Sequence, residues 1–149
     1  MTYRQTRIAT LACCLMGAAF FAQAQADLAA TAAKEKGAVV LPSGLVFQSL
    51  KEGTGRTPAA TDTVRVHYRG VLADGKEFDS SIARGQPAEF PLNRVIPCWT
   101  EGVQRIKVGG KARLTCPPGI AYGSRGAGGA VPPNATLQFE VELLGIAGK

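Results

Sequence analysis

The sequence predicts an α+β domain in which an antiparallel β-sheet wraps around one short α-helix. Stretches that alternate apolar and polar residues outnumber stretches with helical periodicity, and the one short helical pattern has strand patterns on both sides. A content of 18 glycines and 9 prolines also favours strands joined by turns over a helical bundle. With 149 residues, 46% of them hydrophobic, the chain is suited to one compact domain behind a leader.

The N-terminus has the anatomy of a secretory signal peptide. A charged start precedes an apolar run over residues 8–21, and small residues follow at Ala24 and Ala26. Cleavage after either alanine fits, and we favour Ala26, which assigns residues 1–26 to the signal peptide. The apolar run is too short to span a bilayer, and no other segment could. We therefore expect an exported protein without a membrane span, with the periplasm as its destination.

Two further parts follow the leader. Residues 27–40 contain too few apolar residues to fold alone and are predicted to be a short tether or a frayed helix. The folded domain is expected to occupy residues 41–149. Its predicted elements, in order, are a strand at 45–50, a long strand at 61–72, an edge segment at 89–92, a helix from Pro97 closed by Gly109-Gly110, a strand at 112–116 and a last strand at 137–143.

The stretch 66–81 is the most informative part of the chain. Its first residues alternate in the period of a half-buried strand, and Asp74-Gly75 then supplies the residue types of a tight hairpin turn. Beyond the turn, Phe78 stands next to Asp79. A hairpin of this kind can bring Tyr68, Phe78 and Asp79 together, which would form the floor of an apolar pocket with one polar corner.

Conventional catalytic and binding motifs find little support. The formal charge is +6, of which Arg4 and Arg7 of the leader account for two, and the remaining excess forms no basic stripe for nucleic acid. His67 is the only histidine and is expected to be structural, which leaves no catalytic triad and no metal-ligand set. Residues 123–129 are rich in glycine but lack phosphate-loop spacing, so we predict a flexible lid loop. No cofactor is expected.

The hairpin and three later runs together resemble the signatures of the FKBP-type peptidyl-prolyl cis-trans isomerases, in the same order. The later runs are Val-Ile-Pro-Cys-Trp-Thr-Glu-Gly at 95–102, Ile-Ala-Tyr-Gly at 120–123 and the run from Val131 to Val141. The resemblance covers 41–146. It implies the fold predicted above and a non-covalent isomerisation of X-Pro bonds during the folding of exported proteins. Proline-containing polypeptides are the implied partners, with tacrolimus-type macrolides as candidate ligands.

The resemblance also implies that one pocket carries both catalysis and substrate binding. It assigns catalytic roles to Tyr68, Phe78, Asp79 and Tyr122. It assigns substrate-binding roles to Arg84, Val95, Ile96, Trp99, Val131 and Phe139. In this arrangement Trp99 forms the floor under the proline ring, the Tyr122 hydroxyl and the Ile96 N–H bind substrate carbonyls, and Tyr68 and Arg84 hold Asp79.

Some features depart from the family pattern. Ala88 stands where well-known relatives have a bulky aromatic wall residue, so we expect a wider rim and weaker binding of large macrolides. The alternative function is a holdase chaperone or peptide-binding module with little turnover. Relatives with strong chaperone activity often carry an extra domain between the equivalents of Tyr122 and Val131, where this chain has only eight residues. Larger exported relatives carry a helical dimerisation region before the domain, and the lack of room for one here predicts a monomer.

The cysteines predict one disulfide. Cys13 and Cys14 lie in the leader, and the long apolar run after them disfavours a lipoprotein. Removal of the leader leaves Cys98 and Cys116 as the only thiols of an exported chain, where thiols oxidise. The family's fold brings these two positions close together beneath the pocket. A structural bond is favoured over a redox switch, because redox pairs more often occur as exposed C-x-x-C.

Overall fold

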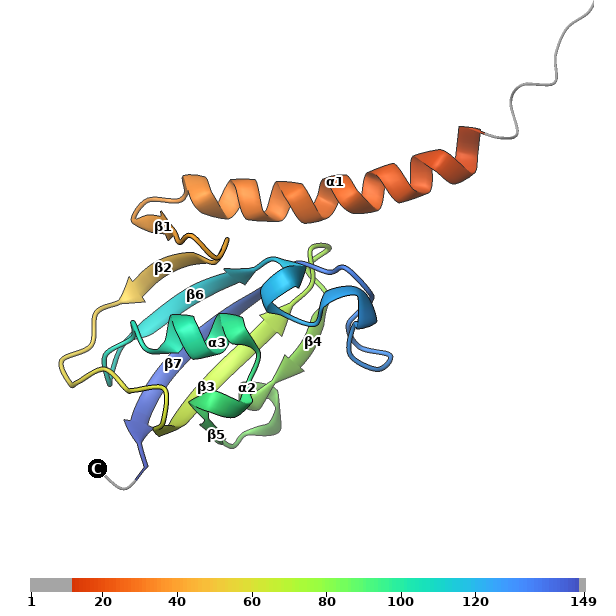
Figure 1. Ribbon diagram of the computed structural model, residues 1–149. Helices are drawn as coiled ribbons and strands as arrows, with labels where there is room; N and C mark the ends of the chain where they lie inside the picture. The colour runs from red at the N-terminus through yellow and green to blue at the C-terminus, as the bar shows by residue number, and fades with distance from the viewer. Residues whose placement is uncertain (1–11, 148–149) are drawn as a thin grey trace, which may run out of the picture.

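The computed structural model describes the backbone of residues 12–147 and the side chains from Phe21 onward. The predicted leader therefore lies partly outside the described residues, since 1–11 are not among them. Among the described residues, the strands form one sheet of seven members (Figure 1). They are β1 (Ala38–Val40), β2 (Val46–Lys51), β3 (Thr63–Val71), β4 (Glu77–Ser80), β5 (Ala88–Pro91), β6 (Lys111–Cys116) and β7 (Leu137–Ile146).

The sheet is antiparallel throughout and has the order β1-β2-β6-β7-β3-β4, with β5 also paired to β3. The central strand β7 alternates buried and half-buried side chains along most of its length, as expected for a strand with one face in the core. The predicted fold class, an antiparallel sheet wrapped across a short helix, is confirmed.

The helix α3 (Pro97–Val103) lies across the concave face of the sheet (Figure 1). Pro97 occupies its first turn, where the missing N–H of proline has no consequence. Gly102 lets the helix come close to β6, because a Cβ at this position would lie 2.8 Å from a methyl carbon of Leu114. The helix is shorter than predicted from the sequence: it ends at Val103 and not at Gly109-Gly110, because the N–H of Ile106 already bonds three residues back, to the carbonyl of Val103.

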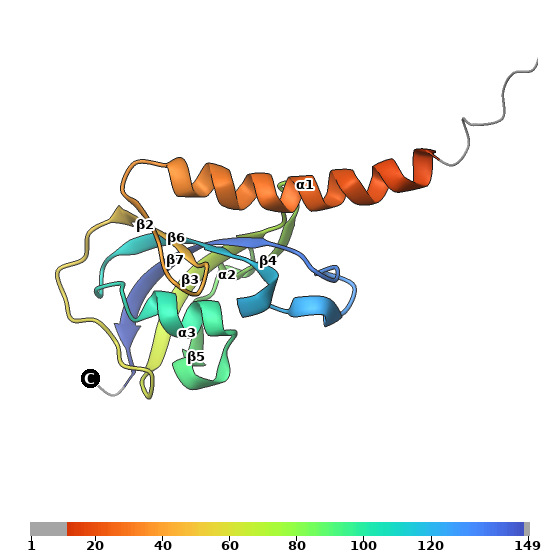
Figure 2. The same cartoon turned by 45° about the horizontal axis from the view of Figure 1, so that its top comes forward.

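The long helix α1 (Ala12–Lys34) lies on the opposite face of the sheet from α3 (Figure 2). It contacts β1, β2 and β6, and Ala32 is buried in this contact. The Oε1 atom of Gln25 accepts a hydrogen bond from the N–H of Thr136, just before β7, at 2.5 Å. No helix in the described part of the chain is long and apolar enough to cross a membrane.

The segment predicted to be a short tether or a frayed helix is partly helical and is more ordered than its composition suggests. Residues 27–34 form the last turns of α1, and residues 38–40 form the edge strand β1, paired with β2. The sheet thus begins at Ala38, before the expected domain start at Leu41. The reason is tertiary: an alanine-rich helix of low amphipathicity gains its stability from packing on the sheet, a contact that local sequence does not report.

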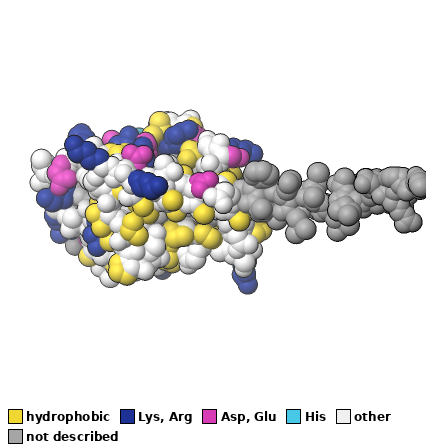
Figure 3. Space-filling model, turned by 90° about the horizontal axis from the view of Figure 1, so that it is seen from above, with side chains coloured by type: hydrophobic (Ala, Val, Ile, Leu, Met, Phe, Trp, Pro, Cys, Tyr) yellow, Lys and Arg dark blue, Asp and Glu magenta, His cyan; other side chains and the backbone are white. Residues whose placement is uncertain are grey.

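The face of the molecule nearest α1 mixes charges of both signs. Figure 3 shows basic side chains interspersed with acidic ones on this face, with apolar side chains gathered toward one side. Ion pairs also join β6 and β7, where Arg113 lies 3.0 Å and Lys111 3.5 Å from Glu140. The hydrogen bond from Arg113, which outweighs the effect of burial, holds the pKa of Glu140 below its usual range.

Candidate active site

A cavity of about 460 Å³ opens between α3 and the concave face of the sheet. Its floor is Trp99, the second residue after Pro97 on α3, and only 4% of this side chain is exposed. The indole is packed edge-on against three aromatic rings, with centroid distances of 5.2 Å to Tyr68, 5.4 Å to Phe90 and 5.4 Å to Phe139. Such edge-to-face contacts fix ring orientation as well as burying area, so the floor is rigid.

The hairpin of β3 and β4 builds one wall of the cavity. The predicted turn is present: Gly75 has a φ of +87°, and the Asp74 carboxylate accepts the N–H of Lys76 at 2.9 Å. Phe78 of β4 and Phe139 of β7 meet with centroids 5.5 Å apart. They meet over Gly70, where a Cβ would come within 2.6 Å of Phe78 and 2.9 Å of Phe139. A glycine in β3 is therefore required for this wall.

A hydrogen-bonded triad forms the polar corner of the cavity. The Tyr68 hydroxyl donates to Asp79 Oδ2 at 2.5 Å, and Arg84 Nη1 donates to Asp79 Oδ1 at 2.5 Å. Arg84 Nη2 also donates to the Tyr68 hydroxyl oxygen at 3.0 Å. Arg84 ends the short helix α2 (Ser81–Arg84), which the Ser80 hydroxyl caps by accepting the N–H of Ala83 at 3.1 Å.

Ser81 fixes α2 behind Tyr68. Its side chain is fully buried, and its hydroxyl oxygen accepts the backbone N–H of Tyr68 at 2.8 Å. The same oxygen lies 2.9 Å from Nδ1 of His67, so the only histidine is engaged outside the pocket. Sequence reasoning did not identify Ser81. Its only available signal is the Ser80-Ser81 pair directly after the hairpin, a common beginning for a helix.

The triad shifts the protonation equilibria of its members. Partial burial opposes ionisation of Asp79, but the hydrogen bonds from Tyr68 and Arg84 and the charge of Arg84 outweigh it, and the pKa of Asp79 is lowered. Burial, followed by the hydrogen bond to Asp79, raises the pKa of Tyr68. The hydrogen bond to Tyr68, followed by that to Asp79, raises the pKa of Arg84. At neutral pH the corner is thus an ionised carboxylate between a neutral phenol and a guanidinium.

Several donors at the cavity are not used within the described residues. The Tyr122 hydroxyl makes no hydrogen bond there, and this side chain is 39% exposed. Burial, with a smaller contribution from the charge of Asp79, raises the pKa of Tyr122, so its hydroxyl keeps its proton. The N–H of Ile96 likewise makes no hydrogen bond among the described residues. Trp99 Nε1 is buried without an acceptor in this part of the chain.

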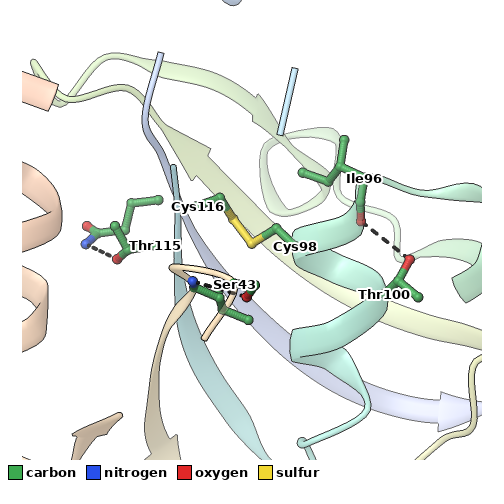
Figure 4. The surroundings of a disulfide bond; sticks show 8 residues. Ser43, Ile96, Cys98, Thr100, Thr115 and Cys116 are labelled. Carbon is green, nitrogen blue, oxygen red and sulfur yellow. Dashed lines mark hydrogen bonds between the residues drawn. A yellow bond between two sulfur atoms is a disulfide. The ribbon is translucent and has the colours of Figure 1, made fainter. Parts of the chain in front are cut away.

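The predicted disulfide is present between Cys98 and Cys116 (Figure 4). It joins the start of α3 to the end of β6, with a Cα–Cα distance of 5.8 Å, and both residues are fully buried. Because Cys98 directly precedes Trp99, the bond fastens the pocket floor to the sheet. A hydrogen bond also holds this helix in place, because the Thr100 hydroxyl donates to the carbonyl of Leu92 at 2.6 Å.

The structure brings together most of the residues that sequence reasoning selected. The cavity is lined by Tyr68, Phe78, Asp79, Val95, Ile96, Trp99, Tyr122 and Phe139. Two selected residues do not line it. Arg84 is not a lining residue, but it donates hydrogen bonds to Asp79 and Tyr68, which are. Val131 is buried in the core, with 3% of its surface exposed, and its backbone pairs with that of Ala127. The glycine-rich loop around Ala127 contains a short 3₁₀ turn, η3 (Gly123–Arg125), and this isolated bridge.

Phe90 and Arg94 also line the cavity and were missed. Strand alternation places Ala88 and Phe90 on the same face of β5, so Phe90 supplies an aromatic wall two residues after Ala88. Its ring lies 5.8 Å from that of Tyr68 and 5.4 Å from that of Trp99. The period of β5 could have revealed Phe90. Arg94 has no such signal, because it lies in the short 3₁₀ turn η1 (Leu92–Arg94).

Fold and cavity define a class of small α+β domain with a rigid aromatic pocket between sheet and helix. Among the described side chains, from Phe21 to Ala147, no cluster of three or more histidine, cysteine, aspartate or glutamate residues could hold a metal ion. The pocket presents an apolar lining, a few hydrogen-bond donors and the carboxylate of Asp79.

Comparisons with known proteins place the chain in a family. A family model for FKBP-type peptidyl-prolyl cis-trans isomerases matches residues 54–144. The chain belongs to this family. The FKBP-type 22 kDa peptidyl-prolyl cis-trans isomerase of Escherichia coli strain K12 is 56% identical over 114 residues, which cover 76% of this chain and 55% of that protein.

Solved structures agree with this assignment. FkpA from Escherichia coli superposes with a TM-score of 0.82 at 47% identity, covering 88% of this chain and 61% of that one. A peptidyl-prolyl cis-trans isomerase from Pseudomonas syringae pv. tomato has a TM-score of 0.76 at 39% identity, covering 83% and 91% respectively. The chain spans about half the length of the curated relatives that it matches, between 42% and 55% for the first three.

Proposed function

We propose that this protein catalyses cis–trans isomerisation of X-Pro bonds in polypeptides. The observation that carries the proposal is the rigid aromatic cavity over Trp99. It has one compensated carboxylate at its corner, and the Tyr122 hydroxyl and the Ile96 N–H are donors that are free within the described residues. The cavity is large enough for a proline ring and its neighbours. X-Pro isomerisation needs no nucleophile, because no covalent bond is made or broken.

The chemistry follows from amide resonance. Rotation about the peptide bond is opposed by a barrier of about 18–20 kcal/mol, because twisting destroys the conjugation between nitrogen and carbonyl. The twisted amide is less polar than the planar one, so water stabilises the planar ground state more. An apolar cavity removes that advantage and thereby favours the transition state over the ground state.

Individual residues take roles that fit their positions. Trp99 supports the proline ring from below, with Phe78 and Phe139 beside it. The Tyr122 hydroxyl and the Ile96 N–H bind carbonyls of the substrate and hold it in a turn. Asp79 is the polar corner, oriented by Tyr68 and Arg84, and Val95 completes the wall. Val131 supports the rim from the core.

The setting we propose is the folding of exported proteins. X-Pro isomerisation takes tens of seconds without a catalyst and can limit folding. A leader over residues 1–26, cleaved on export to the periplasm, and a buried disulfide both suit that compartment. The clients would be partly folded chains with exposed proline, and tacrolimus-type macrolides would compete for the same cavity. We propose that the protein acts as a monomer.

The deciding experiment measures isomerisation directly. Exchange NMR on a proline-containing tetrapeptide reports the cis–trans rate with and without the protein. We expect acceleration at catalytic concentrations that tacrolimus suppresses, together with faster refolding of a proline-limited client. A protein that suppresses aggregation of a proline-free client but accelerates neither reaction would instead be the holdase or peptide-binding module.

A further inference from the structure

The cavity has two arginines near it, and they differ in their partners. Arg84 donates to Asp79 and to Tyr68, so its charge and that of Asp79 compensate each other. Arg94 lines the cavity itself, is exposed, and makes no hydrogen bond or ion pair with any described residue. The negative charge of Asp79 is thus compensated, whereas the positive charge of Arg94 is not compensated by any described residue.

The backbone that carries Arg94 is firmly held. Leu92, at the start of η1, is fully buried, and its N–H donates to the Asp62 carbonyl at 3.0 Å. The Leu92 carbonyl in turn accepts the Thr100 hydroxyl of α3. Arg94 directly precedes Val95 and Ile96, two wall residues of the cavity. The guanidinium can therefore stay in water while its aliphatic stem lies along the apolar wall.

We propose that Arg94 is a specificity-determining residue that selects X-Pro segments with an acidic residue beside the proline over segments with a basic one. This inference rests on the proposed isomerase function and names the substrate class of the same cavity. A carboxylate on the substrate pairs with the uncompensated guanidinium, and a lysine is repelled by it. Isomerisation itself still depends on the apolar floor and the donors, so Arg94 affects which chain is bound and not how the bond rotates.

The expected effect is modest because the pair is exposed to solvent. Exposed ion pairs correspond to about a twofold to fivefold change in an equilibrium constant, and repulsion of lysine adds a similar factor. We therefore expect kcat/KM for a glutamate peptide to exceed that for the matched lysine peptide by about fivefold to tenfold at low salt. The preference should shrink as salt is raised, because screening shortens the reach of surface charges to about 8 Å at physiological ionic strength.

The test uses the full chain and tetrapeptides in which glutamate, glutamine or lysine stands immediately before or immediately after proline. Exchange NMR gives kcat/KM for each peptide with wild type, Arg94→Gln and Arg94→Glu. We expect the glutamate-to-lysine ratio to fall to about one in Arg94→Gln and to invert in Arg94→Glu. Arg105→Glu is the matched control. Arg105 is an exposed arginine beyond the far end of α3, without a side-chain partner among the described residues and outside the cavity, so this variant should keep the wild-type ratio.

The glutamine peptide separates this inference from the proposed function. Turnover of that peptide without a glutamate-to-lysine preference at either position, or a preference retained by Arg94→Gln, would overturn the role of Arg94 and leave isomerisation intact. If no peptide is turned over, the proposed function fails, and peptide binding decides the role of Arg94. Trp99 is the only tryptophan of the chain, so its fluorescence reports binding at the cavity floor. Equal affinity for glutamate and lysine peptides would then refute the inference.

Discussion

The Tyr122 hydroxyl and the Asp79 carboxylate are the polar groups whose removal tests the pocket most directly. Tyr122→Phe deletes one hydroxyl that makes no bond within the described residues, so folding should be unchanged while kcat/KM falls about threefold to tenfold, the value of one hydrogen bond. Asp79→Leu should also lower kcat/KM, because Tyr68 and Arg84 lose their common acceptor. Circular dichroism and exchange NMR provide the two measurements. Full activity in both variants would remove these groups from the mechanism.

The lowered pKa of Asp79 makes a prediction about acid. A carboxyl whose pKa is lower in the folded than in the unfolded state contributes stability that is present above its ordinary pKa of about 4. That contribution is lost as pH falls through the folded-state value. Between pH 6 and pH 3, the free energy of unfolding should therefore decline more steeply for wild type than for Asp79→Asn. Denaturant titrations across that range measure the difference.

A second variant makes the acid prediction specific. The pKa of Glu140 is also lowered, so Glu140→Gln measures the share of the stability loss in acid that arises on the outer face of the sheet.

The catalytic activity should be nearly flat between pH 6 and pH 8, because His67 bonds to Ser81 outside the cavity. A steep rise in kcat/KM over that interval, abolished in His67→Gln, would contradict this assignment.

Gly70 tests whether the aromatic wall depends on close approach. In Gly70→Ala the new methyl group would meet Phe78 at 2.6 Å and Phe139 at 2.9 Å, so both rings must move. We expect the free energy of unfolding to fall by about 1–3 kcal/mol, which is typical of overpacking. We expect kcat/KM to fall by a larger fraction of its wild-type value than the free energy of unfolding does. Gly145→Ala is the control, because a Cβ there meets nothing within 4 Å and this glycine lies in the same sheet. Equal activity in the two variants would argue against the wall.

Among the elements, α3 concentrates the contacts that set the pocket floor, and its disulfide gives a prediction about stability. Closing a loop of 18 residues should stabilise the fold by about 3 kcal/mol in the chain-entropy model. Reduction should therefore lower the Tm by about 10–15 °C and, by loosening Trp99, reduce kcat/KM as well. The Cys98→Ala/Cys116→Ala double variant should start at the lower Tm and not respond to reductant. Two free thiols at positions 98 and 116 of unreduced, denatured protein would refute the bond.

Sequence patterns identified best the elements that carry a full alternation or a specific turn signal. The nine-residue strand β3 and its Asp74-Gly75 turn carry a full alternation and a specific turn signal, and both are present. The helix α2 has four residues and β1 has three, too few for any period to show. The end of α3 was misplaced because Ile106 continues the helical spacing although it lies beyond the last helical residue, buried in the core.

The same reasoning explains which site residues could be predicted. Trp99, Tyr122 and Phe139 stand in ordered family signatures, so their convergence on one cavity was foreseeable. Val131 stands in such a signature too, yet its side chain turns into the core, because a motif fixes position along the chain and not direction. Arg94 lies outside any signature, and only the folded chain shows that it lines the cavity without an ionic partner in the described residues.

At the level of the whole molecule, the two faces of the sheet differ in what lies on them. The cavity lies on the face that α3 covers, and α1 lies on the other (Figure 2). Strand order could not be read from the sequence, because β7 pairs with both β3 and β6 across long intervals of chain. This strand order places Phe139 of β7 beside Trp99 on one face of the sheet. On the other face, the N–H of Thr136, just before β7, donates to Gln25 of α1.

This separation predicts the effect of removing the leader. A chain that begins at Asp27 keeps the last turns of α1, including buried Ala32, but loses Gln25, the acceptor for the N–H of Thr136. The N–H of Thr136 must then find another partner, so the free energy of unfolding should fall by about 1 kcal/mol. The value of kcat/KM should be unchanged, because no described side chain of α1 lines the cavity. Gln25→Ala in the full chain isolates the hydrogen bond and should lose the same stability. Thermal unfolding and exchange NMR on both proteins supply the comparison, and a fragment from Asp27 that folds but has lost activity would show that α1 supports the pocket through the sheet.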